Sequence, residues 1–392
     1  MRYALAAVER AMKVQEVILR ALSGQLTWPQ AADILGRSPR SIRRLRWQYQ
    51  TYGYEGLFDR RRRTPSPKRA PVAEVERLLR LYRERFQGFN VRHFLRRART
   101  EHGVTFCYAF VKKALQGAGL VSKQRPRGRH RRRREPRPCF GEVLHLDGSR
   151  HRWLALVPEQ WFTLLTVVDD ATKQVLYAQL TEGGESTATV MTALRAVFTT
   201  WGLPMALYTD RAHWAAHTPV AGGRVDRTKP TQVGRALAQL GIEHILGYSP
   251  QARGRSERMN GTLQGRLVNE LRAAGITTVA AANRYLGERF LPDFNAEFRR
   301  PPTDPAPAFV PLGRVDLAQI LCHQEERVVA RDNTVVLDGV VMQLAKQPGR
   351  RSCAGLRVVV RRHLEGRHSI WLGARCLGRY DARGRGLTPA AA

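Results

Sequence analysis

Apolar residues recur at helical spacing through the first third of the chain. Over residues 4–22 they lie three or four positions apart, and a shorter run follows between Thr27 and Gly36. Ser38 and Pro39 then open a third run, RSIRRLRWQYQTYG, which is rich in arginine. A short helix, a glycine turn and a basic helix are typical of a helix-turn-helix motif, whose second helix lies in the major groove of DNA.

We therefore predict a helix-turn-helix DNA-binding domain over residues 1–63. The alternative is a solvated basic helix on an ordinary small bundle. The residues of the third run that are expected to face DNA are Ser41, Arg43, Arg44, Arg46 and Gln48.

Helical spacing returns in three further segments, at 72–86, 90–102 and 105–118. We predict a second helix-turn-helix or winged-helix domain over 64–124. Lys112 and Lys113 lie opposite the apolar stripe of its last helix and are candidates for DNA contact. Two tandem domains would cover a longer DNA site than either alone.

Residues 125–139 form an arginine- and proline-rich linker arm. Positions 125–138 hold eight Arg and three Pro, a composition that forms neither a helix nor a core. We predict that the arm lies along DNA phosphates or in a minor groove, and a simple spacer is the alternative. The candidates for DNA contact here are Arg131, Arg132, Arg133 and Arg134.

From residue 140 short apolar runs alternate with helical segments. The runs expected to be strands are 143–146, 162–168, 174–180, 206–209 and 242–246, and the expected helices are 185–200, 232–240 and 253–273. Three strands joined by short turns, followed by strand–helix alternation, predict a mixed sheet covered by helices. This order matches the ribonuclease-H-like α/β fold, and we place that domain at 140–298.

A proline-rich stretch over 299–319 predicts a linker. Beyond residue 320 the apolar period becomes two, and turn dipeptides separate five or six short strands. We predict a small SH3-like β-barrel over 320–385, with a purely structural appendage as the alternative to a DNA-contacting one. Its candidates for phosphate contact are Arg350, Arg351, Arg361, Arg362 and Arg367.

The charge balance adds a polyanionic partner to this picture. The 392 residues include 66 Lys or Arg and 33 Asp or Glu, a net charge of +33, and residues 1–140 alone hold 34 basic and 10 acidic side chains. Such an excess favours nucleic acid, because bound phosphates release their counterions. Arg outnumbers Lys 58 to 8, which suits bidentate phosphate contacts, although the codons of a GC-rich genome would have the same effect.

Other compartments and site types are disfavoured. No apolar run reaches the roughly 18 residues of a membrane span, and charges interrupt the N-terminal segment, unlike the core of a signal peptide. The five cysteines form no CxxC pair, so neither a structural zinc site nor a disulfide framework is expected. We expect a protein of the cytoplasm or nucleoid.

Three carboxylates stand at the ends of expected core elements. Asp147 ends the first strand, Asp210 ends the fourth, and Glu257 lies in the first turns of the long helix. Carboxylates gathered around one point repel one another unless a metal neutralises them, and hard oxygen ligands suit Mg²⁺ or Mn²⁺. Two such ions support in-line phosphoryl transfer. Taken singly, each acid has a structural interpretation, as a loop cap or as an acid at a helix N-terminus.

The motifs around these acids are DGS at 147–149, TDR at 209–211, TQVGRALAQLGIEHI at 231–245 and SPQARGRSERMNGTLQ at 249–264. They resemble the integrase-core (DDE) transposases of bacterial insertion sequences, the ISNCY group above all, and the resemblance covers nearly the whole chain. It implies that Asp147, Asp210 and Glu257 are catalytic ligands of two Mg²⁺ or Mn²⁺ ions in a bacterial protein. The gap between the last two is lengthened by an insertion at 211–230.

Further polar residues near the three acids are candidates for supporting roles. Asn260 shares a helix face with Glu257, and His145 shares a strand face with Asp147. Asp169-Asp170 is interpreted as a structural turn. His213 and Trp214 are interpreted as loop anchors, with contact to a DNA end as the alternative. The arginines expected to hold DNA phosphates beside Glu257, unless they form only a solvated basic face, are Arg253, Arg255, Arg258 and Arg266.

Together these features predict a DNA transposase. It would bind the terminal inverted repeats of its element through residues 1–120, free a 3′-OH by cleavage, and join that hydroxyl to target DNA. Two double-stranded ends must be held together, so a dimer or higher oligomer on DNA is expected. The alternatives are a nuclease of the same fold that cuts without joining, and a domesticated, non-catalytic DNA-binding regulator.

Overall fold

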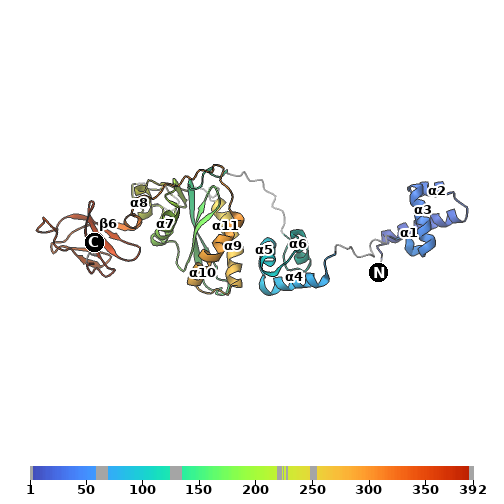
Figure 1. Ribbon diagram of the computed structural model, residues 1–392, viewed down its shortest axis with the longest axis horizontal. Helices are drawn as coiled ribbons and strands as arrows, with labels where there is room; N and C mark the ends of the chain where they lie inside the picture. Colours follow the sequence, from blue (N-terminus) through green and yellow to red (C-terminus); the bar gives the residue numbers. More distant parts are fainter. Residues whose placement is uncertain are drawn as a thin grey trace. The chain divides into compact units, whose positions relative to one another are not determined.

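The computed structural model describes residues 3–58, 69–123, 135–218, 223, 225–226, 228–247 and 254–387, with side chains from residue 257 onward in the last range. The chain divides into two compact units, Met1–Arg77 and Leu78–Ala392, whose elements Figure 1 labels. In the described parts, no helix is both long enough and apolar enough to cross a lipid bilayer.

The first unit is helical, as predicted. Its elements are α1 (Leu5–Leu22), α2 (Trp28–Ile34), α3 (Pro39–Tyr52) and the 3-10 turn η1 (Gly53–Leu57). Two helix starts follow from local hydrogen bonding. Thr27 and Gln30 form a reciprocal capping box on α2, and the Ser38 side chain accepts the Ser41 amide at the start of α3. The long apolar side chains of α1 pack less than their spacing suggests, since Leu5 is 78% exposed.

Three more helices follow, α4 (Val72–Arg85), α5 (Val91–His102) and α6 (Tyr108–Gly117). They enclose a core that includes Leu78, Phe94 and Leu115. Gly103 ends α5 in the left-handed conformation, with φ 64°, which favours glycine. Residues 69–123 contain no strand, so of the two predicted forms they agree with the helical one.

The central part is the predicted mixed sheet. Its elements are β1 (Val143–His151), β2 (Phe162–Asp169), β3 (Val175–Thr181), α7 (Thr187–Trp201), β4 (Ala206–Thr209), α8 (Gln232–Gln239), β5 (Glu243–Leu246) and α9 (Gly254–Ala273). The strand order is β3-β2-β1-β4-β5. The first three strands pair antiparallel, whereas β4 and β5 run parallel to β1.

Helices cover both faces of this sheet (Figure 1). On one face Leu144 and Leu146 of β1 pack with α7 and α8 in one apolar core. On the other face Phe162 and Leu164 of β2 pack with Leu267 of α9 in a second core. The elements that share this second face are α9, α10 (Val279–Tyr285), the π-helical turn η3 (Leu286–Phe290) and α11 (Leu291–Phe298). The sheet is therefore the middle of three layers, and β1 is its central strand.

The C-terminal part contains the short strands that the period of two predicted. They are β6 (His323–Val328), β7 (Thr334–Leu337), β8 (Val340–Gln343), β9 (Arg357–Arg362), β10 (His368–Leu372) and β11 (Arg375–Tyr380), after the short helix α12 (Leu317–Ile320). They form a four-stranded sheet, β11-β10-β9-β6, and the hairpin β7-β8. Arg235 of α8 donates to the carbonyls of Ile320 and Cys322 at 3.1 and 2.6 Å, which ties this part to the central one.

Candidate active site

Asp147 lies on the central strand, on the face that α9 covers. The sequence placed it at the end of a strand, but β1 continues to His151 because β2 pairs with it along its whole length. Asp147 is opposite Thr166, whose hydroxyl donates to the Asp147 carbonyl at 3.3 Å. The prediction of a strand end was therefore wrong for the strand as a whole. The strand end near Asp147 was right only for the pairing of β1 with β4, which ends at His145.

Asp210 follows the last residue of β4 directly. The last residue pair of the parallel register between β1 and β4 is His145 with Tyr208. Continued two residues further, this register would bring Asp147 and Asp210 level, with both side chains on the same face of the sheet. The Asp210 carboxylate accepts the Ala212 amide at 2.9 Å, which turns the chain away after the strand.

A histidine supports the end of β4. His244 of β5 lies 2.9 Å, measured from Nε2, from the Thr209 hydroxyl. Burial lowers the pKa of His244 to about 4. The imidazole is therefore neutral at physiological pH and adds no charge beside Asp210.

The long helix α9 approaches Asp147 through an amide side chain. Asn260 donates from Nδ2 to Asp147 Oδ2 at 2.9 Å, and one turn further Gln264 donates to Ser149 at 3.0 Å. Glu257 precedes Asn260 by three residues, so it shares that helix face one turn closer to the N-terminus. The Glu257 side chain is exposed. Within the described ranges, no three His, Cys, Asp or Glu side chains are close enough to hold a metal ion together.

A cavity opens beside Asp147, between the sheet and the helices α9 and α11. Its back wall contains a buried pair, His145 Nε2 and Asp170 Oδ1, at 2.8 Å. Asp170 also accepts a hydrogen bond from the Arg137 amide at 2.8 Å, which holds the backbone before β1 in place. This agrees with the structural interpretation of Asp170. Residues lining the cavity include Asp147, Asn260, Arg258, Lys173, Phe294 and Arg300.

Asp169 has a structural role as well. Its carboxylate accepts the amides of Gly141 and Thr172 at 2.9 and 2.7 Å and the Thr172 hydroxyl at 2.6 Å. Burial raises the pKa of Asp169 despite these hydrogen bonds. The carboxylate is directed into the loop after β2, and the predicted interpretation as a turn residue is confirmed.

The opposite face of β1 holds a carboxylate that the sequence did not single out. A side-chain carbon at Gly148 would lie 1.9 Å from Glu185 Oε1, so only glycine lets this carboxyl pack against the strand beside Asp147. Trp214, 1% exposed, donates to Glu185 Oε2 at 2.7 Å. The insertion after β4 is thus anchored in the core, as interpreted for Trp214. The glycine of the DGS motif was the available signal for the close approach of Glu185.

The predicted DNA-contacting residues differ in how far the structure describes them. Arg131, Arg132, Arg133, Arg134 and Arg253, and the side chain of Arg255, lie outside the described residues. Lys112 and Lys113 are exposed on α6, and Arg43 and Arg44 are exposed on α3. Ser41 and Gln48 are half-buried.

Some predicted phosphate contacts already have protein partners. Arg46 lies over the Trp28 ring at 4.7 Å and Arg361 over the Trp371 ring at 4.4 Å, and Arg362 is paired with Asp338. For Arg266 the prediction was wrong. It is 6% exposed and donates to both carboxylate oxygens of Glu297, at 2.6 and 2.7 Å.

Comparison with known proteins adds relatives along most of the chain. A family model described as a helix-turn-helix domain matches residues 15–64. The putative transposase y4bF of Sinorhizobium fredii is 29% identical over 374 residues, 94% of this chain and 80% of that protein. The transposase for insertion sequence IS1202 of Streptococcus pneumoniae is 28% identical over 319 residues, 72% of this chain and 67% of that protein. The resemblance to insertion-sequence transposases is therefore confirmed.

Solved structures of integrases are also similar. One is a simian T-cell lymphotropic virus intasome in complex with PP2A regulatory subunit B56 gamma, at 16% identity and TM-score 0.31, covering 80% of this chain and all of that one. Another is the HTLV-2 integrase catalytic core domain in complex with magnesium, at 15% identity and TM-score 0.28, covering 37% of this chain and 83% of that one.

Proposed function

We propose that this protein is the transposase of a bacterial insertion sequence, which cleaves and joins DNA by phosphoryl transfer. The observation that carries the proposal is the parallel register of β1 and β4, which would bring Asp147 and Asp210 level on one face of the sheet if it continued two residues beyond its last pair. The helix that bears Glu257 is hydrogen-bonded to Asp147 through Asn260. The similarity to two transposases over most of the chain supports the same activity.

The three carboxylates are of the ligand type that a hard divalent cation prefers. Asp147, Asp210 and Glu257 would hold Mg²⁺ or Mn²⁺, two ions in all, whose charge would offset the repulsion among the carboxylates. When bound, such ions activate an attacking oxygen and stabilise a leaving oxygen. Asn260 keeps one oxygen of Asp147 in place through its amide. Arg258 lines the adjoining cavity, where its cation would meet a DNA phosphate.

The remaining parts of the chain would hold the DNA. The helix-turn-helix domain would read the terminal repeats through α3, above all through the exposed Arg43 and Arg44. In the next unit α6 would contact DNA through Lys112 and Lys113. A dimer or higher oligomer would keep two ends together.

The finer fold assignments belong to this proposal. The order β3-β2-β1-β4-β5, with three antiparallel strands followed by two parallel ones, supports the ribonuclease-H-like assignment of residues 140–298. Six strands in two small sheets support the SH3-like assignment of residues 320–385.

The activity is tested by incubating the full chain with DNA that carries the terminal repeats, in Mg²⁺ or Mn²⁺. Joined products support a transposase. Cleavage without joining favours a nuclease, and sequence-specific binding without either reaction favours a DNA-binding regulator.

The ligand assignment is tested separately, by titrating Mn²⁺ into the DNA-bound protein and following bound metal by electron paramagnetic resonance. We expect Asp147→Asn and Asp210→Asn to weaken Mn²⁺ binding by an order of magnitude or more. Asp226→Asn, a change on the insertion after β4, is the matched control and should bind as the wild type does. Equal Mn²⁺ affinity in all four proteins would refute the assignment.

A further inference from the structure

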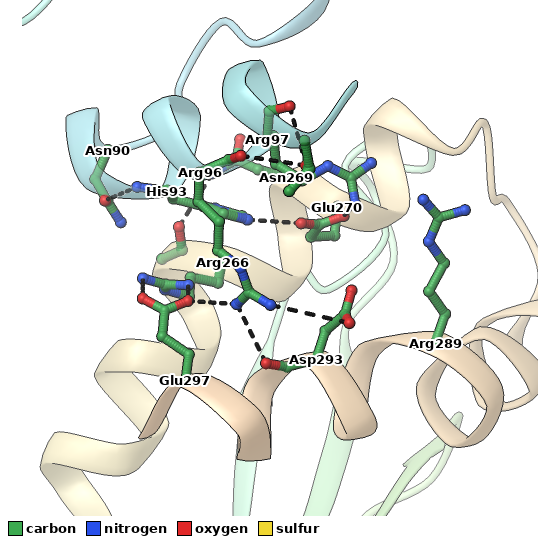
Figure 2. Close-up of polar contacts among 12 residues, drawn as sticks. Asn90, His93, Arg96, Arg97, Arg266, Asn269, Glu270, Arg289, Asp293 and Glu297 are labelled. Carbon is green, nitrogen blue, oxygen red and sulfur yellow. Dashed lines mark hydrogen bonds and ion pairs between the residues drawn. The ribbon is translucent and has the colours of Figure 1, made fainter. Parts of the chain in front are cut away.

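The helix α5 is joined to the catalytic part by buried charges (Figure 2). His93 Nε2 lies 2.6 Å from Glu270 Oε1 on α9, and Arg97 lies 3.2 Å from the other oxygen of that carboxylate. Tyr285 donates to the same carboxylate at 2.7 Å. Glu270 is 5% exposed and His93 3%, so two helices far apart in the chain meet at one buried pair.

A second carboxylate, that of Glu297, also pairs with α5 and with the catalytic part (Figure 2). Glu297 of α11 accepts Arg96 of α5 at 2.6 Å, while Arg266 of α9 binds both of its oxygens. Glu270 thus has two partners on α5 and one in the catalytic part, and Glu297 has one partner in each. We call His93, Arg96, Arg97, Glu270 and Glu297 the α5–α9 interface.

Backbone contacts extend the α5–α9 interface to the turn before α5. Asn269 donates to the Gly88 carbonyl at 3.2 Å, and Arg272 donates to the Gln87 carbonyl. A side-chain carbon at Gly88 would lie 2.9 Å from Asn269 Oδ1. Side chains of α9 therefore hold the backbone of the turn before α5 as well as side chains of α5 itself.

The partners of Glu270 and Glu297 lower the pKa values of both carboxylates. Burial acts to raise the pKa of Glu270, but hydrogen bonds from His93 and Tyr285 and the charge of Arg97 outweigh it and lower that pKa. In Glu297 burial acts in the same direction and is outweighed by Arg266 and Arg96, so its pKa is lowered too. Loss of the His93 and Arg97 side chains with α5 still in place would leave the buried Glu270 with Tyr285 as its remaining hydrogen-bond partner, which is costly.

The same helix reaches the catalytic carboxylates at its other end. Asn260 and Glu270 are ten residues apart on α9, about 15 Å along the helix axis at 1.5 Å per residue. Three leucines between and beyond them, including Leu263 and Leu267, are fully buried against the sheet. The α5–α9 interface therefore connects helices α5 and α6 to the same helix that contacts Asp147 through Asn260.

We propose that the α5–α9 interface is a positioning device that determines which phosphodiester is cut. Lys112 and Lys113 on α6 would fix the DNA, and the interface would transmit that position to the catalytic site through α9. Successive nucleotides are about 3.4 Å apart along the duplex. A shift of α6 by only a few ångströms relative to the catalytic site would therefore move the cut by one nucleotide. This inference rests on the proposed function.

The test compares Glu270→Gln/Glu297→Gln with the wild-type full chain on end-repeat DNA in Mg²⁺. Cleaved 3′ ends are mapped at nucleotide resolution, and DNA affinity is measured in parallel. We expect the wild type to cut at one position, and the double variant to spread at least a third of its cuts over neighbouring positions with affinity changed less than twofold. The charge-matched control is Glu159→Gln/Glu288→Gln, in which both exposed glutamates lie outside the interface; it should cut as the wild type does.

Two further measurements separate positioning from folding. Arg96→Ala removes a side chain that is 35% exposed, so it should fold normally and still broaden the cut. Hydrogen exchange without DNA should accelerate in both variants at residues 88–102 and 266–273 only. Faster exchange there with a single sharp cut position would overturn the proposal. Absence of any metal-dependent cutting by the wild type refutes the proposed function itself, and the positioning role with it.

Discussion

The Arg266 guanidinium distinguishes two interpretations of one residue, a DNA phosphate contact and a structural ion pair. Its place beside Glu257 in the sequence predicted a phosphate contact, whereas the structure buries it against Glu297 and over the Phe298 ring, 4.5 Å from its centre. Arg266→Met keeps the length and apolar stem of the side chain and removes only the guanidinium. The change therefore isolates the ion pair.

The expected loss in the free energy of unfolding depends on how deeply the ion pair is buried and on which partners Glu297 keeps. Breaking a buried ion pair costs about 3–5 kcal/mol, because the partner charge is left without compensation. Here the Glu297 side chain is 21% exposed and keeps Arg96 at 2.6 Å, so we expect a cost at or below the lower end of that range, about 2–3 kcal/mol. In a unit of this size that corresponds to a melting temperature lower by roughly 4–10 °C.

The assay is thermal unfolding of the full chain, combined with DNA affinity at several salt concentrations. Arg258→Met is the matched control, since Arg258 lies on the same helix, is exposed and lines the cavity. It should change the melting temperature far less than Arg266→Met, because an exposed charge contributes little to stability, and reduce the salt slope of binding by about one. If Arg266→Met instead lowers the salt slope and leaves the melting temperature unchanged, the structural role assigned to Arg266 is wrong.

Two other predictions concern acid stability and DNA contact. Because Glu270 and Glu297 have folded pKa values below the ordinary 4.5, their stabilising contribution is present above pH 4.5 and is lost as the pH falls through the lower folded values. Unfolding midpoints between pH 3 and 6 should fall less steeply for Glu270→Gln than for the wild type, and equal slopes would contradict this. In the first unit, Arg43→Ala/Arg44→Ala should reduce the salt slope of DNA binding by about two without changing stability. An unchanged slope would exclude phosphate contacts by these side chains.

Much of the central fold was predictable because its strands are short and bounded by clear turns. The expected strand 206–209 and the expected helix 232–240 agree with β4 and α8 to within one residue. The first strand was predicted too short, because LDGSRH is polar and period alone gives no reason to extend it. Its second half is a strand because β2 pairs with it, and pairing between distant segments is invisible in a local pattern.

Some residues of the candidate site were also predictable from the sequence, and others were not. The motifs singled out Asp147, Asp210 and Asn260 from local sequence alone. Asp210 follows β4 directly, as expected, whereas Asp147 lies within β1 and Asn260 within α9. The partners of α5 were not predictable, because Glu270 and Glu297 lie 177 and 201 residues from His93 and Arg96. Arg266 was misjudged for the same reason, since the counter-charge that buries it belongs to α11.

The central claim is that Asp147, Asp210 and Glu257 together perform the DNA chemistry. The most direct test measures joined product from end-repeat DNA and target DNA in Mg²⁺ for Asp147→Asn, Asp210→Asn and Glu257→Gln, with DNA binding recorded in the same samples. We predict that each variant binds DNA as the wild type does and loses at least a thousandfold in joining, about 4 kcal/mol of transition-state stabilisation. Joining that persists near the wild-type rate in any of the three, with binding intact, would contradict the account.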